Sequence, residues 1–249
     1  MNSLYENINI IHKPSEKEPF LILDKPRGLP SAPLFSGDES ALSYAVEKFP
    51  EIAEVKGKKE IEFGLVHRID TETRGLLLVA CTQDFYDSII LEQTNGRFIK
   101  SYEAYCDLIA GKNLTEGFPK RDESSEYILE CLQNLTNEGS FSLEVRSRFR
   151  PYGLKNSQVR PVNDFAGKAA EKKAGSKEYI TLMELEKSGN EVHAFCKIRE
   201  GYRHQVRCHL AWLGLPIKGD PLYNPKNVSG QQFLFTAVGL EFLGFSFSL

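Results

Sequence analysis

The sequence has few cysteines and no long hydrophobic run. Its five cysteines are an odd number, and no two of them form a C-x-x-C pair. This argues against a disulfide framework or a zinc site and favours reduced thiols in a reducing compartment. No stretch approaches the roughly 20 apolar residues of a membrane span, and residues 1–19 lack the apolar core of a signal peptide. We therefore expect a cytoplasmic protein that does not bind a membrane.

The sequence also lacks an overall positive charge, since its formal net charge is -3. Nucleic-acid-binding domains are often strongly basic, so this total argues against one. Residues 143–178 are an exception, because they contain nine Lys or Arg residues and four acidic residues. Such a local basic surface can bind phosphate within an acidic protein, and the alternative is a solvated lysine-rich loop.

The remaining composition is that of an ordinary globular protein, with 41% hydrophobic and 26% charged residues. Apolar runs and turn signals predict strands at 20–23, 75–80, 97–109, 179–185, 191–198 and 233–240, and helices at 40–49, 82–95 and 203–213. Because no regular βαβ period is present, we predict an α+β fold with a mixed, largely antiparallel sheet and flanking helices. The polar stretches 111–126 and 163–176 are predicted to be surface insertions.

A polar segment from Gly64 to Gly75 leads directly into the apolar run 75–80. Loops that precede a rigid buried strand commonly position reactive groups, which makes Asp70 a candidate. The alternative is a charged turn in which Asp70 pairs with Arg68 or Arg74. Spacing alone favours that turn.

A second segment runs from Gly201 to Leu210 and contains two arginines. If it is helical, Arg203 and Arg207 lie four residues apart on one face, where two guanidiniums can clamp a carboxylate or a phosphate. The alternative is a salt-bridged surface helix.

Two further patterns indicate structure more than chemistry. His204, Cys208 and His209 fit no standard zinc spacing, so we predict no metal site there. The segment Gly214–Tyr223 has two glycines and two prolines, which predicts a rigid turn with a structural role.

Taken together, these segments resemble the RluA family of pseudouridine synthases. The family motif H-R-L-D-x-x-T-S/T-G-L-L-L is matched by His67–Leu78, and G-R-T/S-H-Q-I-R-x-H…G-x-P-I-x-G-D-x-x-Y is matched by Gly201–Tyr223. A K-P-x-G element is matched by Lys25–Gly28, and a K-x-Y element by Lys100–Tyr102. The four motifs occur in the family's order, and the resemblance covers the chain from Phe20 to the C-terminus.

The resemblance implies the pseudouridine synthase fold with a central catalytic cleft. It implies an isomerase that converts specific uridines of structured rRNA or tRNA to pseudouridine, without a metal or other cofactor. We expect a monomer with RNA as its partner, an N-terminal extension at 1–19 and a catalytic domain at 20–249. The S4-type RNA-binding domain of some relatives is expected to be absent.

The resemblance also assigns roles to individual residues. Asp70 is expected to be the catalytic nucleophile toward a flipped-out uridine, Tyr102 to stack on the target base and help remove its C5 proton, and Arg207 to pair with Asp70. The residues expected to bind substrate are His67, Arg68, Thr73, Arg203, His204 and Gln205.

With an RNA substrate, two groups of arginines gain a role. Arg68 is expected to fill the space that the flipped base vacates, because a planar guanidinium can stack on bases and bind phosphate. Arg146, Arg148 and Arg150 are expected to form a phosphate-contacting strand edge.

The chain departs from the family pattern at four positions: Ile69 replaces Leu, Arg74 replaces a small hydroxyl residue, Tyr202 replaces Arg, and Arg203 replaces Thr or Ser. The shifted arginine motivates one alternative, a catalytically inactive RNA-binding protein on the same fold. A second alternative is a hydrolase that uses Asp70 with His67 or His204. Asp70→Asn and pseudouridine mapping discriminate between these hypotheses.

Overall fold

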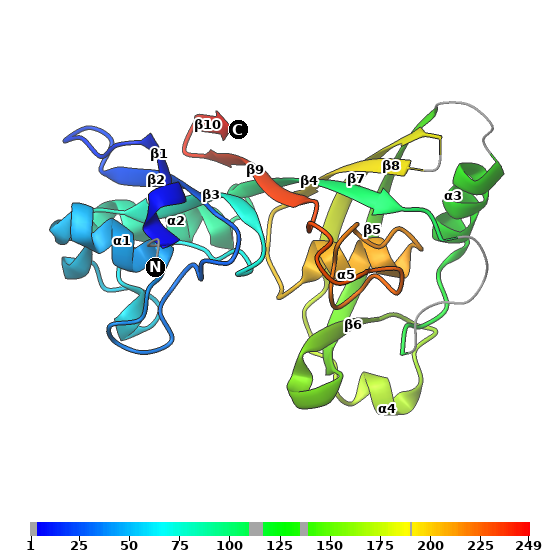
Figure 1. Ribbon diagram of the computed structural model, residues 1–249. Helices are drawn as coiled ribbons and strands as arrows, with labels where there is room; N and C mark the ends of the chain where they lie inside the picture. Colours follow the sequence, from blue (N-terminus) through cyan, green and yellow to red (C-terminus); the bar gives the residue numbers. More distant parts are fainter. Residues whose placement is uncertain (1–3, 110–116, 135–138, 190) are drawn as a thin grey trace. The chain divides into compact units, whose positions relative to one another are not determined.

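The computed structural model describes residues 4–109, 117–134, 139–189 and 191–249, which form two compact units (Figure 1). Unit 1 comprises residues 1–100 and 236–249, and unit 2 comprises residues 101–235. The chain passes from one unit to the other within strand β4 (Ile99–Asp107) and again within strand β9 (Phe235–Phe242).

Unit 1 contains a mixed sheet. Its elements are β1 (Asn9–His12), β2 (Phe20–Lys25), β3 (Arg74–Ala80), most of β9, β10 (Phe245–Ser248), helices α1 (Ala41–Lys48) and α2 (Gln83–Thr94), and the 3-10 helices η1 (Leu4–Asn7), η2 (Pro50–Glu54) and η3 (Glu60–Glu62). Strand β2 pairs antiparallel with β1 and β3, whereas β3 pairs parallel with β9. Gly75 allows this parallel pairing, because a Cβ there would lie 2.1 Å from the Ala237 carbonyl oxygen.

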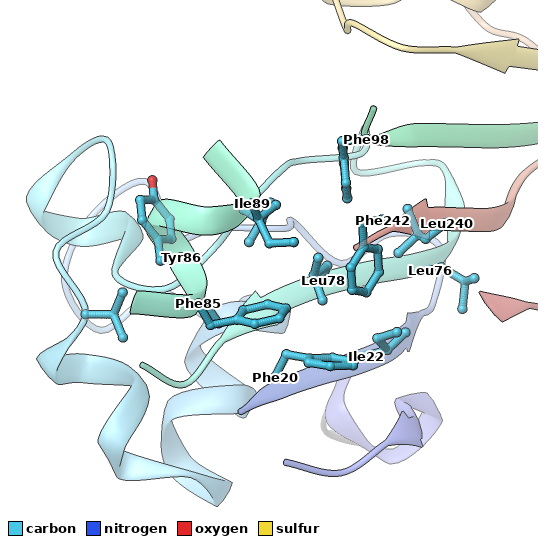
Figure 2. Close-up of a cluster of buried hydrophobic side chains, with 13 residues drawn as sticks. Phe20, Ile22, Leu76, Leu78, Phe85, Tyr86, Ile89, Phe98, Leu240 and Phe242 are labelled. Atoms are coloured by element: carbon cyan, nitrogen blue, oxygen red, sulfur yellow. The ribbon is translucent and has the colours of Figure 1, made fainter. Parts of the chain in front are cut away.

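The core of unit 1 is built on β2 and β3, whose apolar runs are buried almost throughout. Figure 2 shows the cluster in which side chains of these strands meet those of α2 and β9. Phe20 stacks on Phe85 of α2 with 4.8 Å between ring centroids, and the edge of Phe242 packs against it at 5.4 Å. Fully buried strands with continuous apolar runs thus hold the ends of β2 and β3 in place.

Both predicted helix starts in unit 1 are confirmed. The Ser40 side chain accepts a hydrogen bond from the Ser43 N–H at 3.0 Å, and Thr82 accepts one from the Phe85 N–H at 3.4 Å. These side chains satisfy backbone donors that the first turn of a helix leaves without partners. Helix α2 ends before Gly96, which has the left-handed conformation expected at a helix C-terminus (φ 67°).

Unit 2 is built on a sheet with the strand order β4-β8-β7-β5-β6, in which β8–β7, β7–β5 and β5–β6 pair antiparallel. Its further elements are β5 (Gly139–Tyr152), β6 (Gln158–Val162), β7 (Tyr179–Ser188), β8 (Glu191–Ile198), helices α3 (Glu123–Asn134), α4 (Lys168–Glu171) and α5 (Gln205–Trp212), and the 3-10 helix η4 (Leu154–Asn156). Buried and exposed residues alternate along β7 and β8, so one face of the sheet is covered. Helix α5 contacts β6 and β7 and is itself buried along its whole length.

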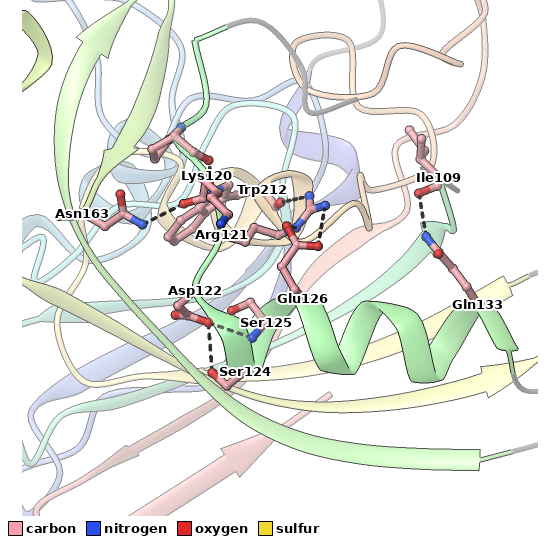
Figure 3. A network of polar contacts seen from close by, with 11 residues as sticks. Ile109, Lys120, Arg121, Asp122, Ser124, Ser125, Glu126, Gln133, Asn163 and Trp212 are labelled. Carbon is pink, nitrogen blue, oxygen red and sulfur yellow. Dashed lines mark hydrogen bonds and ion pairs between the residues drawn. The ribbon is translucent and has the colours of Figure 1, made fainter. Parts of the chain in front are cut away.

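Helix α3 was not predicted, although it begins inside the stretch 111–126 that was expected to be a surface insertion. Figure 3 shows how its start is fixed: Asp122 accepts the Ser125 N–H at 2.7 Å, as an N-cap does. The buried Arg121 bonds Glu126 of α3 and donates to the Trp212 carbonyl at 3.0 Å. Residues 111–116 of this stretch lie outside the described part of the chain.

The predicted fold class is confirmed, because both units combine helices with a sheet in which six described pairings are antiparallel and the pairing of β3 with β9 is parallel. Most of the long strand β5 was missed, since polar and charged residues alternate along it and mask the apolar signal. The N-terminal residues predicted to be an extension include β1, which pairs with β2. Among the described residues, no helix combines the length and apolar character needed to span a membrane.

Candidate active site

The loop that carries Asp70 connects the interior of unit 1 to the start of β3, and a second loop after β2 holds it in place. Ser31 in that second loop bonds Ile69 twice: its hydroxyl donates to the Ile69 carbonyl at 2.7 Å and accepts the Ile69 N–H at 3.1 Å. Both Ser31 and Ile69 are buried. The residue before Asp70 therefore has a fixed backbone position.

The backbone on the other side of Asp70 is fixed as well. The Thr71 carbonyl accepts hydrogen bonds from the Gly28 N–H at 2.9 Å and from the Lys25 ammonium at 3.1 Å. The Thr73 N–H donates to the Asp70 carbonyl at 3.0 Å. Asp70 itself is half-buried, so its carboxylate lies on a loop whose shape is set from both sides.

Lys25 gives the K-P-x-G element a physical role. Its fully buried ammonium donates to the carbonyls of Pro26 and Leu29 as well as Thr71, at 3.0, 2.7 and 3.1 Å. Burial lowers the pKa of Lys25 to about 8, while the Asp70 carboxylate is the strongest of the charges that raise it. Sequence reasoning gave Lys25 no function, and the signal that would have revealed one is a lysine at the end of a fully buried strand.

The two arginines considered as partners of Asp70 have other carboxylate partners. Arg68 lies 3.4 Å from Glu62, and Arg74 bonds Asp24 with a shortest distance of 2.7 Å. Asp24 is buried, so the arginine at position 74 neutralises a carboxylate that burial would otherwise destabilise. This explains one departure from the family pattern, and it argues against the charged-turn interpretation of Asp70.

His67 and Thr73 are interior residues of unit 1. The His67 ring accepts the Leu78 N–H at its Nε2 atom, 3.2 Å away, and packs against Phe98. Its Nδ1 atom and the Thr73 hydroxyl are buried and have no hydrogen-bond partner among the described residues. Substrate binding by either residue stays a prediction.

In unit 2, Arg207 forms a buried ion pair with Asp220. Its Nε and Nη2 atoms donate to the two carboxylate oxygens at 2.9 and 2.8 Å, and both side chains are almost completely buried. The guanidinium carbon also lies 5.0 Å from the centre of the Phe233 ring. Asp220 accepts the N–H groups of Leu222 and Tyr223 as well, which is the structural role predicted for the turn at 214–223.

The expectation that Arg203 and Arg207 lie on one face of a helix was wrong. Helix α5 begins at Gln205, and His204 before it has a left-handed backbone (φ 57°), so Arg203 precedes the helix. Arg203 is exposed and donates to backbone carbonyls of the β5–β6 turn, whereas Arg207 is buried against Asp220. The left-handed backbone at His204 keeps Arg203 out of the helix that contains Arg207, and sequence spacing did not reveal it.

Three other predicted site residues have defined surroundings in unit 2. The His204 Nδ1 atom lies 3.1 Å from the Tyr223 hydroxyl. Buried Gln205 accepts the Tyr202 N–H and donates to the Ile180 carbonyl, each at 2.9 Å. Tyr102 is buried and its ring stacks on Phe235. Their functional roles stay predictions.

His209 is a buried histidine that sequence reasoning left without a role. Its ring nitrogens lie 2.9 Å from the Ser147 hydroxyl of β5 and 2.8 Å from the Thr181 hydroxyl of β7. These contacts attach α5, and with it Arg207, to the central strands of unit 2. Burial lowers the pKa of His209 to about 3.

The two buried histidines predict a loss of stability in acid. Burial, with a smaller contribution from the Lys100 ammonium, also lowers the pKa of His67 from 6.5 to about 3. Between these pH values the unfolded chain binds more protons than the folded chain, so the free energy of unfolding falls as pH falls. We expect a loss of about 2 kcal/mol for each histidine by about pH 5, measured by urea unfolding followed by circular dichroism.

Variants separate this effect from general acid sensitivity. His209→Gln should be less stable than wild type at neutral pH but should lose less stability on acidification. His193→Gln changes a partly exposed histidine that pairs with Glu103, and it serves as the comparison for replacing a histidine outside the core. An equal acid response in wild type and His209→Gln would contradict the assignment.

Comparisons with known proteins identify the family. The family model for RNA pseudouridylate synthase matches residues 19–212. A ribosomal large subunit pseudouridine synthase D of Pseudomonas aeruginosa is 27% identical over 209 residues, covering 84% of this chain and 52% of the relative. An uncharacterised RNA pseudouridine synthase of Bacillus subtilis is 24% identical, covering 85% of this chain and 57% of the relative. The chain thus spans about half the length of these curated relatives.

Solved structures support the same fold. The human RNA pseudouridylate synthase domain containing 1 matches with a TM-score of 0.61 and 19% identity, covering 96% of this chain and 80% of its own. The human RNA pseudouridylate synthase domain containing 4 matches with a TM-score of 0.60 and 16% identity, covering 97% of this chain and 87% of its own. The fold, the ordered motifs and the family match agree, and the chain belongs to the RNA pseudouridylate synthase family.

Proposed function

We propose that this protein is an RNA pseudouridine synthase that isomerises uridines of rRNA or tRNA, with Asp70 as its nucleophile. The observation that carries the proposal is the geometry of the Asp70 loop. The backbone on both sides of Asp70 is held by hydrogen bonds from the loop after β2, within a chain that matches the family model. A preorganised carboxylate suits nucleophilic catalysis, because little ordering is needed when substrate binds.

The proposed reaction needs a uracil nucleobase that is accessible to Asp70. The enzyme breaks the N1–C1′ bond of uridine, rotates the base and joins it again through C5. The proton lost from C5 is matched by a proton gained at N1, so atoms balance without a redox partner or a cofactor. We propose that the uridine leaves its stack to react, at a cost of about a few kcal/mol, and that Arg68 fills the vacated space. The exposure of Arg68, whose side chain is 61% accessible, supports this role.

Residues of unit 2 complete the proposed mechanism. Tyr102 stacks on the target base and helps remove its C5 proton, and Arg207 forms an ion pair with the Asp70 carboxylate. The position of Arg207 supports its part, because it lies within the residues that match the family model and is the arginine that the resemblance pairs with the nucleophile. The proposed substrate-binding residues remain His67, Arg68, Thr73, Arg203, His204 and Gln205.

We further propose that residues 20–249 form the catalytic part, and that the protein acts as a cytoplasmic monomer. The names of the relatives favour ribosomal RNA as the substrate, since one of them is a ribosomal large subunit pseudouridine synthase.

Pseudouridine mapping tests the proposal. Ribosomal and transfer RNA from cells with and without the gene are treated with a carbodiimide that marks pseudouridine, and the marks are located by reverse transcription. At least one mark should disappear without the gene and return when the wild-type chain is supplied. If every mark persists, and purified protein converts no uridine in transcripts of either RNA class, the proposed activity is wrong.

A further inference from the structure

The basic residues of unit 2 differ in whether the protein already neutralises them. Arg146 pairs with Glu144 and Glu178, Arg148 makes two bonds to Glu171, and Lys177 pairs with Glu200. These carboxylates offset part of the local positive charge, so Arg146 and Arg148 attract phosphate less strongly than their number suggests, and their contact with phosphate stays a prediction.

Arg160 does not supply a surface charge either. It is buried, and its guanidinium carbon lies 4.4 Å from the centre of the Phe118 ring and 4.2 Å from that of Tyr152. These cation–π contacts fix the β5–β6 hairpin from within. Residues 143–178 therefore contribute fewer available positive charges than their composition suggests.

Some basic residues of unit 2 keep an available positive charge, and two of them lie at the β5–β6 turn. Lys155 and Arg203 are exposed, and neither forms an ion pair with a carboxylate of the described residues. Arg203 donates to the carbonyl of Asn156 and, at 3.0 Å, to that of Gln158. The guanidinium is thus held over the turn by neutral acceptors, which orient it without cancelling its charge.

The turn itself has a defined conformation. Lys155 and Asn156 both have left-handed backbones, with φ of 51° and 58°. The Asn156 N–H donates to the Gly153 carbonyl at 3.2 Å, and the Ser157 N–H donates to the Leu154 carbonyl at 3.0 Å. Non-glycine residues in this conformation are uncommon, and such positions cluster at functional sites.

An aromatic ring lies directly beside Arg203 in the chain. Tyr202 stacks on buried Phe149 with 4.9 Å between ring centroids and 7° between planes. The ring of Tyr179 packs against the Tyr202 ring, with 5.2 Å between centroids. Tyr202 is half-buried, and its hydroxyl makes no hydrogen bond to the residues that the structure describes. The ring is therefore held rigidly while part of it stays accessible.

We infer that Tyr202, Arg203 and Lys155 form a second RNA-contacting surface, on unit 2, that binds an unpaired segment of the substrate. Arg203 and Lys155 contact phosphate, and Tyr202 contacts a nucleobase. Accessible cations beside a fixed aromatic ring match the chemistry of single-stranded RNA, whose bases stack on aromatic side chains while its phosphates bind cations. The inference rests on the proposed function. It assigns a role in substrate choice to Tyr202 and Arg203, the two residues that depart from the family motif in this segment.

Equilibrium binding tests the inference. The probe is a fluorescently labelled RNA stem–loop with unpaired uridines in its loop, titrated at salt concentrations from about 50 to 200 mM. Arg203→Gln should raise Kd several-fold. It should also reduce the slope of log Kd against log salt concentration by about 1, the change expected for the loss of one phosphate contact. Lys155→Gln should change both quantities in the same direction.

Tyr202 has a different expected signature. Tyr202→Leu should raise Kd roughly tenfold without changing the salt slope, because stacking is not a charge contact. Tyr202→Phe keeps the ring and should bind nearly as wild type, which separates lost stacking from a general effect of substitution. With a fully double-stranded probe, Tyr202→Leu should have little effect.

Lys17→Gln is the matched control. It removes the same charge from an exposed lysine of unit 1 and should leave Kd and the salt slope unchanged. If Arg203→Gln and Lys155→Gln behave like Lys17→Gln, the second surface does not exist. If the variants bind as expected but the wild type forms no pseudouridine, the proposed activity fails while the surface stands.

Discussion

Asp70→Asn is expected to form pseudouridine at least about 10⁴-fold more slowly than wild type, a loss typical of removing a catalytic nucleophile. An amide has nearly the size of the carboxylate but cannot attack in its place. The hydrogen bonds that shape the loop involve backbone atoms of Ile69, Asp70 and Thr71, so they survive the substitution. The variant should therefore fold and bind RNA close to wild type while losing turnover, measured by single-turnover assay on a mapped substrate.

Glu72→Gln provides the control for this experiment. Glu72 is an exposed carboxylate two residues further along the same loop, so its loss changes the charge by the same amount. It should retain most of the activity. If Asp70→Asn keeps wild-type turnover, the nucleophile has been assigned wrongly. Equal losses in both variants would instead indicate that the charge of the loop matters and not the carboxylate of Asp70.

The parts of the fold that the sequence predicted are those whose signals are local. The caps at Ser40 and Thr82 are short-range hydrogen bonds, and their helices begin where expected. The apolar runs that became β2 and β3 are buried on both faces and were also recognised. Helix α3 was missed because its cap, Asp122, lies within a polar stretch whose composition suggested a loop.

The candidate active site also combines a locally recognisable residue with contacts that the sequence does not reveal. The motif identified Asp70, but the contacts that fix its loop come from residues far away in the chain. Ser31 is separated from Ile69 by 38 positions, and Lys25 from Thr71 by 46. No periodicity connects such residues, so the restraint became visible only in the folded chain.

The arginines show how a correct residue can acquire an unexpected partner. Arg74 departs from the family pattern, and Asp24, 50 positions earlier, is the residue that it neutralises. Arg203 and Arg207 were placed together by helical spacing, whereas the left-handed backbone at His204 separates them. The helix thus begins after Arg203, which stays exposed, while Arg207 within the helix is buried against Asp220.

Breaking the buried Arg207–Asp220 pair is expected to destabilise unit 2 by about 3–5 kcal/mol. The side chains are 3% and 0% accessible, so either charge left alone would remain in a medium that solvates it poorly. Asp220→Asn keeps an oxygen for the N–H groups of Leu222 and Tyr223 and isolates the loss of charge. Trp212, the protein's single tryptophan, lies buried in α5 and reports the unfolding of unit 2 by its fluorescence.

The double variant separates the ion pair from its surroundings. Arg207→Met combined with Asp220→Asn should be less destabilised than the sum of the single variants, because neither charge is then left alone. Lys177→Met is the control: its pair with Glu200 is largely exposed, and its loss should cost about 1 kcal/mol or less. Strict additivity, or single losses as small as that of Lys177→Met, would show that the pair does not hold α5 to the 214–223 turn. The position of Arg207 would then have to come from the His209 contacts with Ser147 and Thr181 alone.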